Sequence, residues 1–231
     1  MSDETVMIEA FRRISTATIT TVLLKKGLRN VWMRGVLPLR PGQPRQVGRA
    51  FTLRFIPARE DLATPAAWSS PTSTRAAVEV MTPGSIVVVD AMGVTDAGIF
   101  GDILCGRMAK RGISGLITDG ALRDLDGVNA TGLPVWASGI AAPPAVAALT
   151  FVGWGDPVGC GGVAVFPNDL IVADNDGAVV IPGALINEVL SEAQEQEDLE
   201  AWIVGEVEKG KELPGLYPPN EETLARYRNR N

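Results

Sequence analysis

The runs Ser85-Ile-Val-Val-Val-Asp90, Gly115-Leu-Ile-Thr118 and Leu133-Pro-Val-Trp136 decide the fold. Short, β-branched, apolar runs of this kind are typical of strands that are buried on both faces of a parallel sheet. Helical patterns lie between them, over residues 101–111 and 123–130. Strands and helices that alternate with such short connections predict right-handed βαβ crossovers.

The sequence on either side of this unit predicts a second layer of strands. Residues 48–56 partly alternate apolar and polar side chains, as a half-buried strand does. Farther on, Asn- and Asp-rich turns separate short apolar runs, which is typical of antiparallel strands. These strands are expected at residues 163–166, 170–173 and 178–181.

Helices are predicted at both ends of the chain. Residues 4–26 have the spacing of two helices, and residues 184–209 that of one long acidic helix followed by a packing tail. No repeat or linker interrupts the sequence, so we predict a single α/β domain over residues 1–231. Its parts are the N-terminal helices (1–27), a core in which a β-layer stacks on a βαβ layer (28–182), and the C-terminal helix and tail (183–231).

Composition excludes several classes of function. None of the 231 residues is histidine, which excludes Ser-His-Asp and Cys-His triads and histidine-ligated metal sites. A net charge of −6 argues against a nucleic-acid groove. Cys105 and Cys160 show no CxxC pattern, which favours reduced thiols and a cytoplasmic protein.

Neither a secretory signal nor a membrane helix is predicted. The N-terminus is acidic and has no apolar stretch. The uncharged segment 132–155 is long enough to span a bilayer, but prolines and glycines interrupt it. We therefore expect this segment to form buried strands and loops.

The first candidate site is Gly98-Ile-Phe-Gly101-Asp102, which leads into a helix. A glycine before a helix lets a carboxylate or phosphate approach the free N–H groups of the first turn. The alternative is that Asp102 only caps or stabilises the helix, and on this stretch alone that interpretation is favoured.

The second candidate site is Thr118–Gly127, at the carboxyl end of a predicted strand. Its three acids and one arginine (Asp119, Asp124, Asp126 and Arg123) could hold a hard cation such as Mg²⁺. A solvated turn, with Asp119 in an Asx-turn and Asp124 capping the next helix, is equally compatible with the residues. Because both segments would meet at one sheet edge, their combination favours a ligand site.

These residues resemble the central signature of the RraA-like family. The resemblance rests on Gly101-Asp-Ile-Leu-Cys105 and on Gly112–Asp124, and it extends over roughly residues 10–205. That family includes the 4-hydroxy-4-methyl-2-oxoglutarate / 4-carboxy-4-hydroxy-2-oxoadipate aldolases and the regulators of ribonuclease activity.

The resemblance implies a fold, an assembly and roles for particular residues. The fold would be a three-layer β/β/α swivelling-type sandwich, assembled as homotrimers or hexamers with sites between subunits. Asp124 would hold Mg²⁺ or Mn²⁺, and Arg123 would contact the substrate and steady a pyruvate enolate. Substrate would bind to the backbone amides of Gly101, Asp102, Ile103 and Leu104, with Asp102 near the waters of the metal. A glutamate of the neighbouring subunit's C-terminal helix, Glu197 or next Glu195, would complete the outer shell.

The implied activity is a metal-dependent class II aldolase that cleaves a 4-hydroxy-2-oxo acid to pyruvate and a carbonyl product. Oxaloacetate decarboxylation, which passes through the same enolate, would be a side activity. The alternative is a non-catalytic regulator that binds an RNA-degrading enzyme. One departure concerns Ala137–Pro144, which is nearly apolar where aldolases often carry polar residues. This departure leaves open a substrate with a less charged aldehyde or ketone half.

Overall fold

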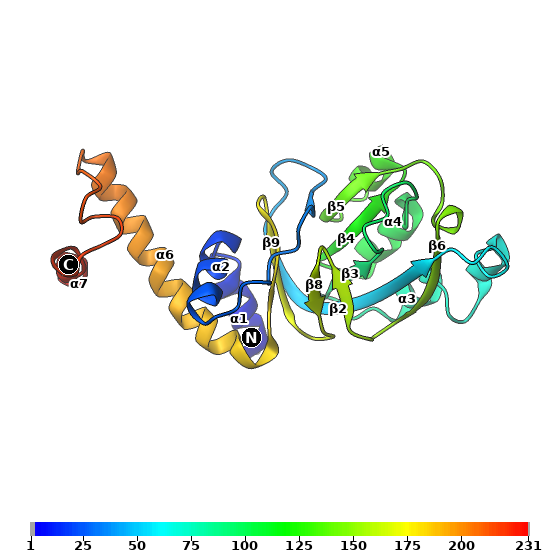
Figure 1. Ribbon diagram of the computed structural model, residues 1–231, viewed down its shortest axis with the longest axis horizontal. Helices are drawn as coiled ribbons and strands as arrows, with labels where there is room; N and C mark the ends of the chain where they lie inside the picture. Colours follow the sequence, from blue (N-terminus) through cyan, green and yellow to red (C-terminus); the bar gives the residue numbers. More distant parts are fainter. Residues whose placement is uncertain (1–2, 231) are drawn as a thin grey trace.

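An eight-stranded sheet organises the computed structural model, which describes residues 3–230 (Figure 1). Seven of its strands follow the order β1-β5-β4-β3-β2-β9-β10, and β6 pairs with β2. The strands are β1 (Leu37–Pro38), β2 (Gln46–Pro57), β3 (Ile86–Asp90), β4 (Gly115–Leu122), β5 (Val135–Ile140), β6 (Leu149–Trp154), β9 (Leu170–Asp174) and β10 (Gly177–Ile181). Strands β7 (Val158–Cys160) and β8 (Val163–Val165) form a separate antiparallel pair.

The predicted parallel unit is present. Strand β3 runs parallel to β2 and β4, and β4 runs parallel to β5. Helices α4 (Asp102–Lys110) and α5 (Leu125–Ala130) make the connections. Strand β4 is longer than predicted, because after a register irregularity between Thr118 and Ala121 it continues to Leu122.

Strand β2 joins the two halves of the sheet. Its first residues, Gln46–Arg49, pair with β9, whereas Ala50–Arg54 pair with β3 and Leu53–Pro57 pair with β6. Because β2 is shared in this way, the sheet bends back on itself and is nearly closed. Strands β9 and β10, with β8 beside them, pack against β3–β5 across one core.

Alternating side chains divide the interior into layers. In β3, Val87 and Val89 pack in the core shared with α4 and α5, whereas Ile86 and Val88 pack in the core shared with β8–β10. Helix α3 (Thr74–Val80) covers the first of these cores. The predicted β/β/α layering is thus confirmed.

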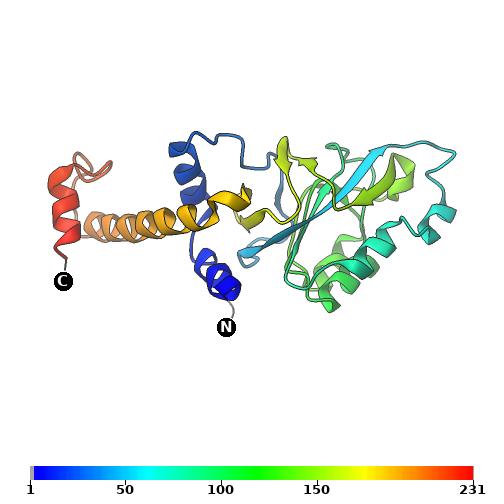
Figure 2. The same cartoon turned by 90° about the horizontal axis from the view of Figure 1, so that it is seen from below.

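A third core lies between β9, β10 and the terminal helices α1 (Asp3–Phe11), α2 (Thr16–Lys25) and α6 (Ile186–Glu208). Helix α6 extends away from the sheet and carries α7 (Glu221–Arg228) at its far end (Figures 1 and 2). Helix α7 was not predicted, since a packing tail was expected there. Asn220 caps α7 by accepting from the N–H of Thr223, and Arg226 pairs with Glu206 of α6.

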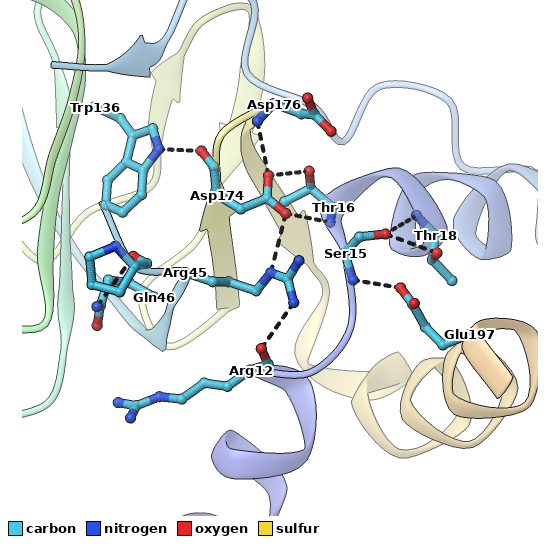
Figure 3. Close-up of polar contacts among 11 residues, drawn as sticks. Arg12, Ser15, Thr16, Thr18, Arg45, Gln46, Trp136, Asp174, Asp176 and Glu197 are labelled. Carbon is cyan, nitrogen blue, oxygen red and sulfur yellow. Dashed lines mark hydrogen bonds and ion pairs between the residues drawn. The ribbon is translucent and has the colours of Figure 1, made fainter. Parts of the chain in front are cut away.

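Asp174, at the end of β9, fastens the N-terminal helices to the sheet (Figure 3). Its carboxylate accepts from the N–H of Thr16 at 2.9 Å and from the Thr16 hydroxyl at 2.7 Å. It also accepts from Nε of Arg45 at 3.2 Å, while its carbonyl accepts from Nε1 of Trp136. The buried side chain of Asp174 therefore joins strand β9, the turn between β9 and β10, and the start of α2.

The segment 132–155 forms β5, the 3₁₀ helix η2 (Ala145–Ala147) and β6, so the expected strands and loops are present. The expected burial holds only in part: Val135, Trp136, Ala137 and Leu149 are buried, whereas most of the rest is half-buried or exposed. Two further 3₁₀ helices are η1 (Pro65–Ser69) and η3 (Gly183–Leu185). Across residues 3–230, no helix combines the length and the apolar character needed to cross a membrane.

Candidate active site

Two backbone segments meet at the carboxyl end of β4. The N–H of Ile99 donates to the carbonyl of Ala121 at 2.9 Å, and the N–H of Arg123 donates to the carbonyl of Phe100 at 2.9 Å. These bonds set the start of α4 beside the start of α5. The structure thus brings together the two segments that the sequence singled out separately.

Three glycines make this approach possible. A Cβ on Gly98 would lie 2.7 Å from Cβ of Arg123, and one on Gly101 would lie 2.6 Å from Oδ2 of Asp124. A Cβ on Gly127 would lie 2.7 Å from Cβ of Asp102. Any side chain at these positions would therefore force the neighbouring residue to move. Gly127 was not identified as important from the sequence, because its contact is made only in three dimensions.

Asp124 occupies the N-cap position of α5 without capping it. Its backbone is left-handed, with φ 57° and ψ 49°, and its side chain makes no cap hydrogen bond. The capping interpretation of this residue is therefore wrong. Its Oδ2 instead accepts from Nε of Arg123 at 3.1 Å. An aspartate held in this conformation costs of order 1 kcal/mol, so the fold holds the carboxylate in place against a local preference.

Asp102 is the first residue of α4, and its side chain is exposed. Its Oδ1 accepts from the N–H of Ile103 at 2.7 Å. The capping interpretation is thus partly correct for Asp102. A substrate that used the Ile103 amide would have to compete with this carboxylate.

A pocket of about 690 Å³ opens at this junction. Every residue predicted to bind substrate or metal lines it, namely Gly101, Asp102, Ile103, Leu104, Arg123 and Asp124. Another part of its lining comes from residues 61–75, which no motif in the sequence connects with the site. The lone tryptophan of that stretch, Trp68, was the available signal, but nothing in the sequence placed it near Asp124.

Asp119 does not join this group. It is buried in β4, where its carboxylate accepts from the N–H groups of Ala91 at 2.9 Å and Gly161 at 3.4 Å. Burial raises its pKa, against the opposing effect of these N–H donors. The prediction that Asp119, Asp124 and Asp126 form one cluster is therefore wrong. Asp119 instead holds the backbone of Ala91 and Gly161 in place. Among residues 3–230, no three Asp, Glu or Cys side chains come together to hold a metal.

Glu197 lies on α6, where its carboxylate accepts from the N–H of Ser15 at 2.7 Å (Figure 3). Burial would raise its pKa, but this N–H and the hydroxyls of Thr18 and Ser15 hold the pKa below its usual value. Neither Glu197 nor the exposed Glu195 lines the pocket of its own chain. A role for either in a neighbouring subunit stays a prediction.

Cys105 is expected to be inert to alkylation in the folded protein. Burial raises the pKa of its thiol to about 12, so almost none is thiolate at about pH 8. Cys160 is also buried, and burial raises its thiol pKa too. Intact-mass measurement after iodoacetamide treatment should show no adduct on the native protein and two adducts on the urea-unfolded protein. Rapid labelling of the native protein would show that these two thiols are not buried.

Comparisons with known proteins agree with this fold. The model of the RraA-like family, described as Aldolase/RraA, matches residues 16–180. Two curated relatives are provisionally named 4-hydroxy-4-methyl-2-oxoglutarate aldolases. One, from Halalkalibacterium halodurans, is 37% identical over 118 residues, which are 50% of this chain and 54% of the relative. The other, from Pseudomonas syringae pv. tomato, is 37% identical over 109 residues, which are 47% of this chain and 66% of the relative. The chain thus covers less than two thirds of either relative.

Solved structures match over most of the chain. RraAS2 of Streptomyces coelicolor, described as an unusual member of the RNase ES inhibitor RraA protein family, superimposes with a TM-score of 0.77 at 33% identity, covering 87% of this chain and 96% of that one. An uncharacterized protein from Pseudomonas syringae pv. tomato gives a TM-score of 0.79 at 25% identity, covering 92% of this chain and 97% of that one. The chain belongs to the RraA-like family.

Proposed function

We propose that this protein is a carbon–carbon lyase that cleaves a 4-hydroxy-2-oxo acid to pyruvate and a carbonyl product, with a divalent cation. One observation carries the proposal. The carboxylate of Asp124 does not cap its helix and lies beside the Arg123 guanidinium, in a pocket that the first turn of α4 also lines. The aldolase names of the relatives support the same reaction class.

The residues of this pocket fit a Mg²⁺ or Mn²⁺ ion. Mg²⁺ takes oxygen ligands and is often held by one or two carboxylates together with waters. Asp124 would hold the cation and Asp102 would face its waters. The missing side chain of Gly101 lets Oδ2 of Asp124 approach the start of α4 closely, since a Cβ on Gly101 would lie 2.6 Å from that atom. When bound, the cation would stabilise the negative charge that develops on the pyruvate fragment.

The chain's own groups would supply the remaining chemistry. Nε of Arg123 is used by Asp124, which leaves the terminal N–H groups of the guanidinium to donate to the substrate carboxylate and the developing enolate. Breaking the C3–C4 bond leaves its electron pair on the pyruvate fragment as an enolate. The 4-hydroxyl proton must be accepted as the bond breaks, and a proton must then be returned to C3 to give pyruvate. With no histidine in the chain, the exposed carboxylate of Asp102 is the acceptor we propose.

The test is pyruvate release from a panel of 4-hydroxy-2-oxo acids and from oxaloacetate, coupled to lactate dehydrogenase. We expect turnover with Mg²⁺ or Mn²⁺, loss of turnover after EDTA treatment, and recovery when the cation is returned. Undiminished turnover after exhaustive EDTA treatment would contradict the metal proposal. Absence of turnover on every substrate would contradict the lyase proposal.

The relationship to RraAS2 supports a second candidate, a regulator that binds a ribonuclease. A surface that only binds protein does not need a strained aspartate beside an arginine in a pocket, so we rank this candidate second. Tight binding to a ribonuclease scaffold, together with no turnover, would reverse the ranking.

We also propose that the protein is cytoplasmic and assembles as a homotrimer or hexamer with its sites between subunits. Light scattering coupled to size-exclusion chromatography tests the assembly. A monomer at assay concentration would contradict it.

Replacing Gly101 with alanine is expected to lower pyruvate release about ten- to a hundredfold, because a shift of about 1 Å in a catalytic group can lower the rate by such a factor. The new Cβ would push Oδ2 of Asp124 aside, and that atom can rotate away without unfolding the chain. The matched control is Gly106→Ala in the same helix, where a Cβ would meet Cγ2 of Thr131 at an ordinary 3.6 Å. Equal activity of the two variants would show that the close approach of Asp124 to Gly101 is not required.

A further inference from the structure

Residues 61–75 form a wall of the pocket that the proposed chemistry does not use. This segment, named here the 61–75 wall, follows β2, contains the 3₁₀ helix η1 and ends in the first turn of α3. In Figure 1 the cyan chain between β2 and α3 extends beyond the end of the sheet. The same pocket is lined by Arg123 and Asp124, so a substrate held by those residues would have its other half available to the rest of the lining.

Large apolar side chains gather around this pocket with much of their surface exposed. Leu62 and Trp68 of the wall are 51% and 37% exposed, and Val152 of β6 is 40% exposed. Ile103, next to Asp102, is 81% exposed. Scattered exposed apolar residues are ordinary, but several around one pocket indicate an apolar ligand.

The charged side chains of the wall are already engaged by neighbours. Asp61 pairs with Arg59 just outside the wall, and the guanidinium carbon of Arg75 lies 4.9 Å from the ring centroid of Trp68. Across the described residues 3–230, Arg75 pairs with no carboxylate. We interpret Arg75 as a positioning residue that holds the indole of Trp68 by a cation–π contact.

Aromatic side chains of the sheet also line the pocket. Phe151 of β6 packs edge-on against Phe55 of β2, with ring centroids 5.2 Å apart, and both line the pocket. A volume of about 690 Å³ exceeds what pyruvate and a small aldehyde need, and pockets of about 300–1,000 Å³ enclose drug-sized ligands.

We propose that the 61–75 wall binds a bulky apolar distal half of the substrate, with the Trp68 indole as its platform. This proposal rests on the proposed function, because it takes the 2-oxo acid end to lie at Arg123 and Asp124. The substrate class is then a 4-hydroxy-2-oxo acid with an aromatic or branched aliphatic group beyond C4, in place of a second carboxylate. The wall selects by apolar burial. A distal carboxylate there would lose hydration, and Arg75, the cation of the wall, would have to leave the Trp68 ring to pair with it.

Two ligands that differ only at the distal end test this proposal. 2-Oxo-4-phenylbutanoate and 2-oxoglutarate share the 2-oxo acid end and the chain length, and one carries a phenyl ring where the other carries a carboxylate. Calorimetric titration with Mg²⁺ present should give wild-type protein a Kd at least about tenfold lower for the phenyl compound.

Variants of the wall identify the residue responsible for this preference. Trp68→Ala should reduce the ratio of the two dissociation constants to about one, whereas Trp68→Phe should retain most of it. Arg75→Ala should reduce the ratio partly, because it only loosens the indole. A variant that had merely unfolded the site would weaken both ligands equally, and circular dichroism would detect wider unfolding.

Several results would overturn the inference. They are tighter binding of 2-oxoglutarate than of the phenyl compound, a specific loss of 2-oxoglutarate binding in Arg75→Ala, and no measurable binding of the phenyl compound. A Trp68→Ala protein that keeps the preference but changes its oligomeric state would also overturn it, since Trp68 would then belong to a subunit contact. Failure of wild-type protein to release pyruvate would contradict the proposed function alone, because these titrations need no turnover.

Discussion

Replacing Asp124 with asparagine is expected to lower pyruvate release at least about a thousandfold, which corresponds to about 4 kcal/mol of transition-state stabilisation. Asparagine has the same shape and tolerates a left-handed backbone, which Asp124 adopts at φ 57°. The substitution therefore removes the negative charge without disturbing the turn. Loss of this charge would leave the cation without the carboxylate proposed to bind it, and the Arg123 guanidinium without its ion-pair partner.

The matched control is Asp126→Asn, an exposed acid in the first turn of the same helix. It should keep wild-type activity, and both variants should unfold within about 1 kcal/mol of wild type in urea, since surface substitutions seldom change stability by more. Asp102→Asn should lower the rate less than Asp124→Asn, because Asp102 is proposed to act on a proton and on the waters of the metal. An Asp124→Asn enzyme that kept full activity would refute the assignment of this residue.

Replacing Asp174 with alanine is expected to lower the free energy of unfolding by about 3–5 kcal/mol, because two buried donors of Thr16 and one half-buried donor of Arg45 lose their acceptor. The change removes the acceptor for the N–H and hydroxyl of Thr16, which is itself buried, and for Nε of Arg45 (Figure 3). Unpaired buried donors are costly because water cannot reach them. Urea unfolding followed by circular dichroism measures the loss.

Asp176→Ala in the same turn is the control. Asp176 has an exposed side chain, and its backbone N–H donates to Asp174, so its replacement should cost less than about 1 kcal/mol. Because the Asp174 network lies outside the pocket lining, folded Asp174→Ala protein should still bind 2-oxo acids. Equal stability of the two variants would show that Asp174 does not fasten the N-terminal helices.

The sequence predicted the layers of this fold because each strand carries its own signal. In β3, alternate β-branched residues face different cores, and the turns after residues 166 and 174 carry their Asn, Asp and Gly in the chain itself. Helix α7 escaped prediction because it is only eight residues long and strongly polar. It packs against α6 through Tyr227, whose ring contacts Trp202. The length of β4 escaped because Asp119 and Gly120 read as a turn, while in the fold Asp119 is satisfied by Ala91 and Gly161 from elsewhere in the chain.

By itself the sequence determined which chemistry the protein can use. It has no histidine, its two cysteines are isolated, and it carries an arginine–aspartate pair after a buried strand. Tertiary structure alone decided which acids share a site, since Asp119 turns inward while Asp124 faces the pocket beside Gly101. It also decided that the 61–75 wall lines the same pocket as that aspartate. The physical reason is that covalent neighbours fix only local periodicity and turn preference, whereas a pocket depends on close approach between distant segments. Here that approach is permitted by the missing side chains of Gly98, Gly101 and Gly127.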